Sequence, residues 1–65
     1  MTDKQKEIIA YLSNCTGPAS PTEIGQACGK DYSAASGWAS SGLKSLVVAG
    51  RVKRFDGGYY ELVRV

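Results

Sequence analysis

The first part of the chain carries apolar residues at helical spacing, which predicts a helix over about residues 3–14. Its apolar face consists of Ile8, Ile9, Leu12 and Cys15, with Tyr11 at the edge. Thr2 and Gln5 have the spacing of a capping box, in which each side chain bonds a backbone N–H that the helix leaves unpaired. Gly17 and Pro18 follow and are typical of a helix end.

A second, shorter helix is predicted to begin at Pro21, because proline is favoured at the first helical position. Ser20 precedes it as the N-cap, and Glu23 stands three residues after the cap. The residues expected to point inward are Ile24, Ala27 and Cys28. Gly29 is the expected end of this helix.

A third helix is predicted to begin between residues 33 and 36 and to run to about residue 49. Its inward face consists of Ala35, Ala39, Leu43, Leu46 and Val47, with Trp38 and Gly42 alongside. Its outward face consists of Ser33, Ser36, Gly37, Ser40, Ser41, Lys44 and Ser45. Gly37 and Gly42 each lower the helix propensity by about 1 kcal/mol relative to alanine, so packing against other elements must stabilise this helix. Small residues on the outward face also allow another molecule to approach closely.

Two strands joined by the turn "DGG" are predicted in residues 51–55 and 59–63. A three-residue turn places Gly58 in the left-handed conformation. The pairs in this register are Phe55 with Tyr59, Val52 with Leu62 on the core face, and Lys53 with Glu61 on the outer face. A two-residue turn would instead place Phe55 opposite Tyr60. We favour the first register because it aligns the two apolar residues on the core face.

Positive charge is concentrated in the middle-to-late part of the chain, although the formal net charge is only +2. Residues 30–54 carry five basic side chains and one acidic side chain, whereas residues 1–29 and 55–65 each carry a net charge of −1. Such an asymmetry favours an anionic partner.

The sequence shows no arrangement of residues that is typical of a catalytic site. The chain has no histidine, no phosphate-binding glycine loop and no pair of carboxylates at a catalytic spacing, so we expect neither an enzyme nor a cofactor. Cys15 and Cys28 fit no zinc-binding pattern, so no metal site is expected. We interpret them as small buried thiols, and a disulfide or a redox thiol is the alternative. No signal peptide or membrane span is recognised, which favours a cytoplasmic protein without membrane contact.

Two stretches, "SPTEIGQACG" and "LKSLVVAGRVKRF", resemble the winged helix-turn-helix superfamily. The second contains the leucine-rich helix end, the glycine and the following apolar residue that recur in that superfamily, here Leu43, Leu46, Gly50 and Val52. The resemblance covers nearly the whole chain and implies a single α+β domain over residues 1–65. It would contain three helices, a C-terminal β-hairpin wing, and a very short extra strand in "GPAS" between the first two helices.

The resemblance implies binding of double-stranded DNA, by a small transcriptional regulator or an accessory factor. The third helix would lie in the major groove and the basic hairpin would lie on the adjacent backbone. The candidate DNA-binding residues are Lys30, Ser33, Ser36, Gly37, Ser40, Ser41, Lys44, Arg51, Lys53 and Arg54. The outward face has no Arg, Asn or Gln to read bases bidentately, so we expect contacts to phosphate and DNA shape with little base specificity.

Other interpretations of these residues stay open. Lys53 and Arg54 also suit an edge strand that must avoid aggregation. Trp38 suits the core better than a ligand platform. Phe55 and Tyr59 suit stacking on a base or sugar, docking on a protein, or a cross-strand pair within the hairpin. The alternative functions are a winged helix that binds a protein partner without DNA, and a binder of RNA or single strands. Because the core of a 65-residue domain is small, a homodimer or a protein partner that adds stability is also considered.

Overall fold

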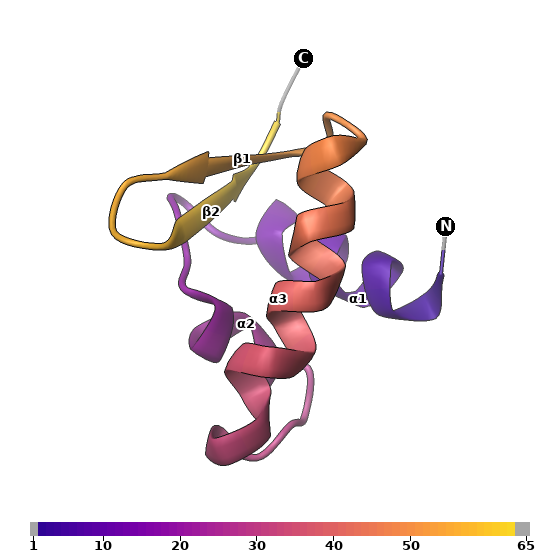
Figure 1. Cartoon of the computed structure of the whole chain (residues 1–65), viewed down its shortest axis with the longest axis vertical. Helices are drawn as coiled ribbons and strands as arrows, with labels where there is room; N and C mark the ends of the chain where they lie inside the picture. Colours follow the sequence, from indigo (N-terminus) through magenta and orange to yellow (C-terminus); the bar gives the residue numbers. More distant parts are fainter. Residues whose placement is uncertain (1, 64–65) are drawn as a thin grey trace.

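Residues 2–63 of the computed structural model form three helices followed by a two-stranded antiparallel hairpin (Figure 1). The elements are α1 (Asp3–Ser13), α2 (Pro21–Ala27), α3 (Tyr32–Val48), β1 (Val52–Phe55) and β2 (Tyr59–Leu62). This arrangement confirms the predicted α+β class and has a winged-helix-like layout. None of the described helices has the length and apolar character needed to cross a bilayer.

The first two helices begin where their capping residues predict. The Gln5 N–H donates to Thr2 Oγ1 at 3.2 Å, and the Thr2 N–H donates to Gln5 Oε1 at 2.9 Å, which completes the capping box of α1. The Glu23 N–H donates to Ser20 Oγ at 3.2 Å at the start of α2. These local bonds satisfy backbone donors that a helix start otherwise leaves unpaired.

The start of α3 differs from the prediction, since the helix begins at Tyr32 rather than between residues 33 and 36. Asp31 is its N-cap, and its carbonyl accepts from the N–H groups of Ala34 and Ala35 at 3.0 and 2.8 Å. The Asp31 side chain makes no capping hydrogen bond. The backbone alone therefore marks this helix start, without the side-chain bond that makes a capping motif recognisable in a sequence.

The inward stripe of α2 also differs from the prediction, because Ala27 is exposed and Gly25 is buried. A Cβ atom added at Gly25 would lie 2.3 Å from the carbonyl oxygen of Ala35 in α3. The backbones of α2 and α3 are therefore in direct contact at this point, and only glycine leaves room for that contact.

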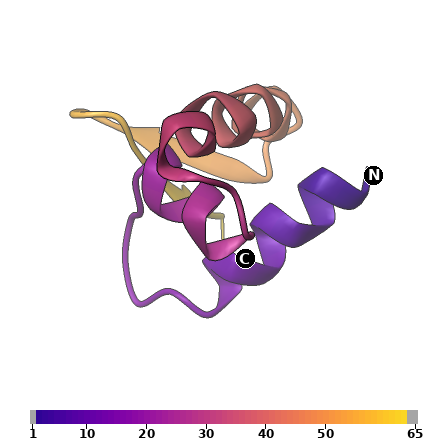
Figure 2. The same cartoon turned by 90° about the horizontal axis from the view of Figure 1, so that it is seen from below.

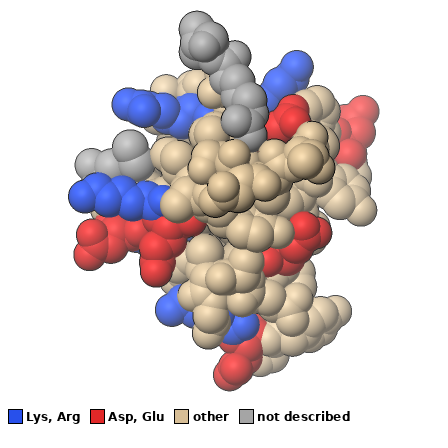
Figure 3. Space-filling view, turned by 180° about the vertical axis from the view of Figure 1, so that it is seen from behind, with Lys and Arg blue, Asp and Glu red and all other residues tan. Residues whose placement is uncertain are grey.

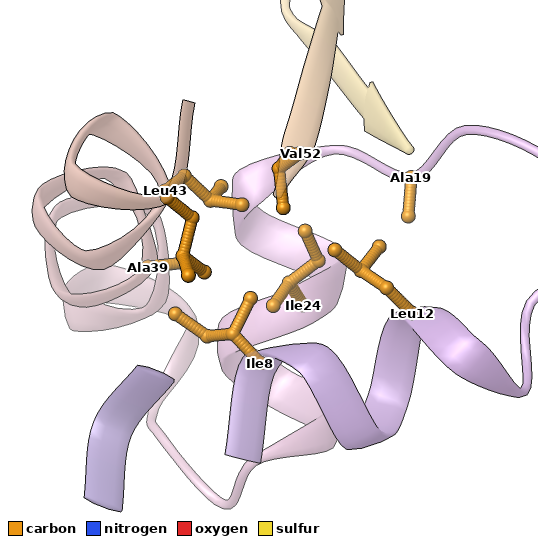
Figure 4. Packing of buried hydrophobic residues seen from close by; sticks show 8 residues of the cluster. Ile8, Leu12, Ala19, Ile24, Ala39, Leu43 and Val52 are labelled. Carbon is orange, nitrogen blue, oxygen red and sulfur yellow. The ribbon is translucent and has the colours of Figure 1, made fainter. Parts of the chain in front are cut away.

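The core lies where all three helices meet the hairpin (Figure 4). Its buried side chains come from α1, α2, α3, β1 and the connection between α1 and α2. They are Ile8, Leu12, Ala19, Ile24, Ala39, Leu43, Leu46 and Val52. Among the described residues no polar or charged side chain is buried. The fold is therefore stabilised by burial of apolar surface rather than by a buried polar network.

The hairpin has the favoured register, with Phe55 opposite Tyr59, and this prediction is confirmed. The remaining pairs are Val52 with Leu62, Lys53 with Glu61, and Arg54 with Tyr60. Gly57 and Gly58 both have positive φ angles, of 87° and 82°. The turn therefore needs two left-handed residues, whereas the sequence predicted one.

The extra strand expected between α1 and α2 is reduced to a single β-bridge. The Ala19 N–H donates to the Tyr60 carbonyl at 2.8 Å, and the Tyr60 N–H donates to the Ala19 carbonyl at 2.9 Å. The bridge attaches β2 to the α1–α2 connection. Seen from below, the hairpin projects on one side of α3 and the N-terminal end of α1 projects on the other (Figure 2).

The contact between α2 and α3 gives a first prediction. Gly25→Ala should lower the free energy of unfolding by about 1–3 kcal/mol, because its Cβ has no space against the Ala35 carbonyl. The matched control is Gly37→Ala, where nothing lies within 4 Å of the added Cβ. This control should raise stability by up to about 1 kcal/mol through helix propensity. Urea denaturation measures both, and a Gly25→Ala variant as stable as the parent would contradict the packing described here.

A second prediction concerns the junction of α3 with the hairpin, where the Leu46 side chain is 2% exposed. Leu46→Ala should lower the free energy of unfolding by about 2–5 kcal/mol, through lost burial and the cavity that remains. Ser36→Ala on the exposed face should be nearly neutral. Thermal or urea unfolding of the two variants tests the helix phase, and similar midpoints for both would show it to be wrong.

Candidate nucleic-acid interface

One face of α3 carries a row of small polar residues and a lysine, and the C-terminal part of this row lies beside the hairpin. Ser33, Ser36, Ser40 and Lys44 follow one another at three- or four-residue spacing, so they share one face of the helix. Ser40 is half-buried and the other three are exposed. Gly37 lies at the outer edge of this face, with open space where a side chain would stand. The face is therefore accessible along most of the helix.

The C-terminal half of α3 and the hairpin enclose an open hollow of about 360 Å³, here called the α3–hairpin hollow. It is lined by Ser40, Lys44, Val47, Val48, Arg54 and Tyr60. No acidic residue is part of this lining. Within residues 2–63, neither Lys44 nor Arg54 forms an ion pair with a carboxylate. Two cations from different elements thus border one hollow, and none of residues 2–63 adds a negative charge to its lining.

The charge of the opposite side of the molecule is mixed. Figure 3 shows acidic and basic side chains interspersed over a surface that is largely uncharged. The acidic residues of the helical part include Asp3 and Glu7 in α1 and Glu23 in α2. The α3–hairpin hollow differs from that side because its charged lining is of one sign.

The basic residues of the hairpin lie on two different faces, because successive side chains of a strand point to opposite sides. Arg54 shares a face with its cross-strand partner Tyr60, and both line the hollow. Lys53 lies on the other face, where its Nζ is 5.3 Å from the centroid of the Phe55 ring. Arg51 is exposed in the bend that precedes β1. The predicted basic cluster of the hairpin is therefore not one continuous surface.

Lys30 and Ser41, two further predicted site residues, lie on the side of α3 that contacts α1. The Nζ atoms of Lys30 and Lys4 each lie 5.1 Å from the centroid of the Trp38 ring. Lys4 also donates a hydrogen bond to Ser41 Oγ, and that hydroxyl donates to the Trp38 carbonyl at 3.2 Å. These residues join α1 to α3 through cation–π contacts and hydrogen bonds. Trp38 itself packs against the core, as predicted.

Three residues of the hollow were not among the predicted site residues. Val47 had been assigned to the core and is only half-buried, while Val48 is 84% exposed. Tyr60 could have been found, because the favoured register already placed it opposite Arg54. Nothing in the sequence indicates that Val47 and Val48 line the hollow, because this depends on where the hairpin lies relative to α3.

Comparison with protein-family models, curated proteins and solved structures gives no match for this chain. The function must therefore be argued from the geometry and charge of the chain itself.

A polar contact between α1 and α2 lies away from this interface. The Tyr11 hydroxyl donates to Glu23 Oε2 at 3.0 Å. Partial burial raises the pKa of Tyr11, and the hydrogen bond to the Glu23 carboxylate raises this pKa further. The hydroxyl therefore stays protonated at neutral pH and continues to donate, which links the start of α2 to α1.

The two cysteines are half-buried rather than fully buried, in contrast to the prediction. Cys28 is the C-cap of α2, and Cys15 follows the C-cap of α1 and packs against the core. Burial raises the pKa of the Cys28 thiol, and the Glu7 charge raises it further, while Lys30 acts in the opposite direction. No group of acidic residues and cysteines in residues 2–63 is placed to hold a metal ion.

The raised pKa of Cys28 gives a third prediction. At neutral pH, Cys28 in a Cys15→Ser variant should react with a thiol reagent more slowly than an unstructured cysteine peptide. The reason is that the thiolate is the reactive species and a raised pKa lowers its fraction. The rate should continue to rise at pH values where the peptide rate has levelled off. Urea should restore the peptide rate, and equal rates for the native protein and the peptide would contradict this account.

Proposed function

We propose that this chain binds double-stranded DNA through the outward face of α3 and the hairpin, as a small transcriptional regulator or accessory factor. The observation that carries the proposal is that Lys44 and Arg54 line one hollow whose described lining contains no acidic residue, whereas Asp56 lies with Arg54 at a separate hollow near the hairpin turn. Unpaired cations grouped in this way suit an anionic backbone, whose neutralisation releases counterions and supplies most of the affinity.

The shape of α3 supports the same proposal. Its 17 residues extend over about 25 Å, and the major groove admits an α-helix. Ser33, Ser36 and Gly37 are exposed and small, so they do not obstruct close approach to the groove. Serine hydroxyls bond phosphate oxygens or base edges of either type. The absence of Arg, Asn and Gln from this face predicts an affinity that varies little with sequence.

The hairpin completes the interface. In a winged helix the hairpin lies on the backbone next to the groove that holds the third helix. Arg54 would contact phosphate from the face toward α3, and Lys53 and Arg51 would contact phosphates beyond it. The layout also supports membership of the winged helix-turn-helix superfamily. A cytoplasmic location fits this role and thiols that are kept reduced.

A second candidate function is a winged helix that binds a protein partner. The observation that favours it is the pair of aromatic residues at the end of the hairpin. Tyr59 is 47% exposed and lies opposite the half-buried Phe55. Exposed aromatic side chains are enriched at protein interfaces. In this function Phe55 and Tyr59 would contribute most of the binding, and Lys44 would contribute little.

A fourth prediction tests the DNA-binding proposal. In an NMR titration with a random-sequence duplex at low salt, the amides that shift should include those of Ser36, Ser40, Lys44 and Arg54. The amides of Glu7 and Ala10 on α1 should not shift. Binding should weaken steeply as salt is raised, because phosphate contacts supply the affinity. Absence of duplex binding at low salt would contradict the proposal and favour the protein-binding function.

A matched pair of substitutions extends this test. Lys44→Gln should weaken binding to every duplex by a similar factor, because a phosphate contact carries little sequence information. The control is Lys6→Gln, which removes the same charge from an exposed position on α1. Equal losses for the two variants would mean that only net charge matters, and not the face of α3.

A further inference from the structure

The α3–hairpin hollow has the composition of a site for one phosphate and its attached sugar. We propose that Lys44 and Arg54 hold the same phosphate of a bound DNA strand in this hollow, with the deoxyribose against Val48 and Tyr60. The inference rests on the proposed DNA binding and specifies how one part of that surface works. It differs from a general basic patch because it assigns two cations to a single phosphate.

The charges around the hollow support a shared phosphate. Lys44 comes from α3 and Arg54 from β1, and both line the same hollow of about 360 Å³. Two positive groups facing one space repel each other, and neither is neutralised by a carboxylate within residues 2–63. An anion between them would remove this repulsion and bond both side chains. Arginine in particular presents a planar set of donors that matches phosphate oxygens.

The uncharged lining supports a sugar–phosphate unit rather than a free anion. Val47, Val48 and Tyr60 give the hollow an apolar wall, and Val48 is 84% exposed. A deoxyribose ring presents C–H groups that suit such a wall, whereas an inorganic ion does not need one. Ser40 and Tyr60 also belong to the lining, and both carry hydroxyls, which are common phosphate donors. Charge and apolar surface therefore both match one nucleotide unit of the backbone.

Lys53 provides the internal comparison for this proposal. It is adjacent to Arg54 in sequence but lies on the opposite face of the hairpin, with its ammonium over the Phe55 ring. It is not part of the lining of the hollow. We therefore expect Lys53 to contact a different phosphate from the one held by Arg54.

Double-mutant cycles on duplex binding test the shared phosphate. The variants are Lys44→Gln, Arg54→Gln, Lys53→Gln and the two double variants that contain Arg54→Gln. For Lys44 with Arg54, the combined loss in log K should differ clearly from the sum of the single losses, since both act on one phosphate and are therefore coupled. The salt slope of this double variant should fall by about 0.9, the value for a single phosphate. For Lys53 with Arg54, the losses in log K and in slope should add.

The outcomes separate this inference from the proposed function. A parent protein that binds no duplex overturns the DNA proposal and the shared phosphate together. A parent that binds, with losses at Lys44 and Arg54 that add and a slope that falls by about 1.8, overturns the shared phosphate alone. Thermal unfolding of each variant confirms that the exposed substitutions leave the fold intact.

A second pair of variants tests whether the hollow is the binding site. Val48→Glu places a carboxylate at the hollow and should weaken duplex binding by about tenfold, roughly the loss of one charge-assisted hydrogen bond. Ala49→Glu adds the same charge one residue further on, at an exposed position that does not line the hollow. The duplex affinity of Ala49→Glu should therefore be closer to that of the parent protein. If Ala49→Glu is as damaging as Val48→Glu, the hollow is not the site.

Discussion

The backbone contact between Gly25 and Ala35 sets the orientation of α3, and the candidate interface depends on that orientation. A side chain at position 25 would meet the Ala35 carbonyl at 2.3 Å, so glycine is what lets α2 approach this closely. Once α2 lies against α3, Ala39 and Leu43 face the core. The small polar residues on the other side of α3 are then exposed. A buried contact in the helical layer thus determines which side of α3 is available to a partner.

Close packing against α1 and α2 explains how α3 is maintained despite its weak intrinsic helix propensity. Gly37 and Gly42 both lie within α3, and each costs about 1 kcal/mol of helix propensity. Gly42 is buried against α1, where an added Cβ would lie 2.7 Å from Ile8 Cδ1. Gly37 has no such neighbour and is open to solvent. Gly42 therefore allows close packing against α1. Gly37 leaves the outward face of α3 without a side chain at that position, which would suit a surface that another molecule approaches closely.

Local signals in the sequence were sufficient to predict most of the fold. They did not reveal contacts between residues that lie far apart in the sequence. The capping box at Thr2 and the N-cap at Ser20 lie within a few residues of the bonds they form. The hairpin register follows from aligning Val52 with an apolar partner. Gly25 has no comparable signal, because its role exists only when α3 is in place. Lys30 was likewise grouped with the hairpin by its charge, whereas Trp38 holds it on the other side of α3.

The register of the hairpin carries a further consequence for function. Side chains in a strand alternate between faces, so a slip of one residue would exchange Arg54 and Lys53 between the hollow and the opposite face. The observed register pairs Arg54 with Tyr60, and the bridge between Ala19 and Tyr60 attaches β2 to the α1–α2 connection on the edge away from β1. Two neighbouring cations of equal formal charge thereby acquire different surroundings. If α3 enters a groove as proposed, Arg54 is the basic residue of the hairpin that shares a hollow with the helix, and the two faces of the hairpin would contact different parts of the backbone. An interface of this kind distinguishes DNA by the spacing and shape of its backbone rather than by its base edges.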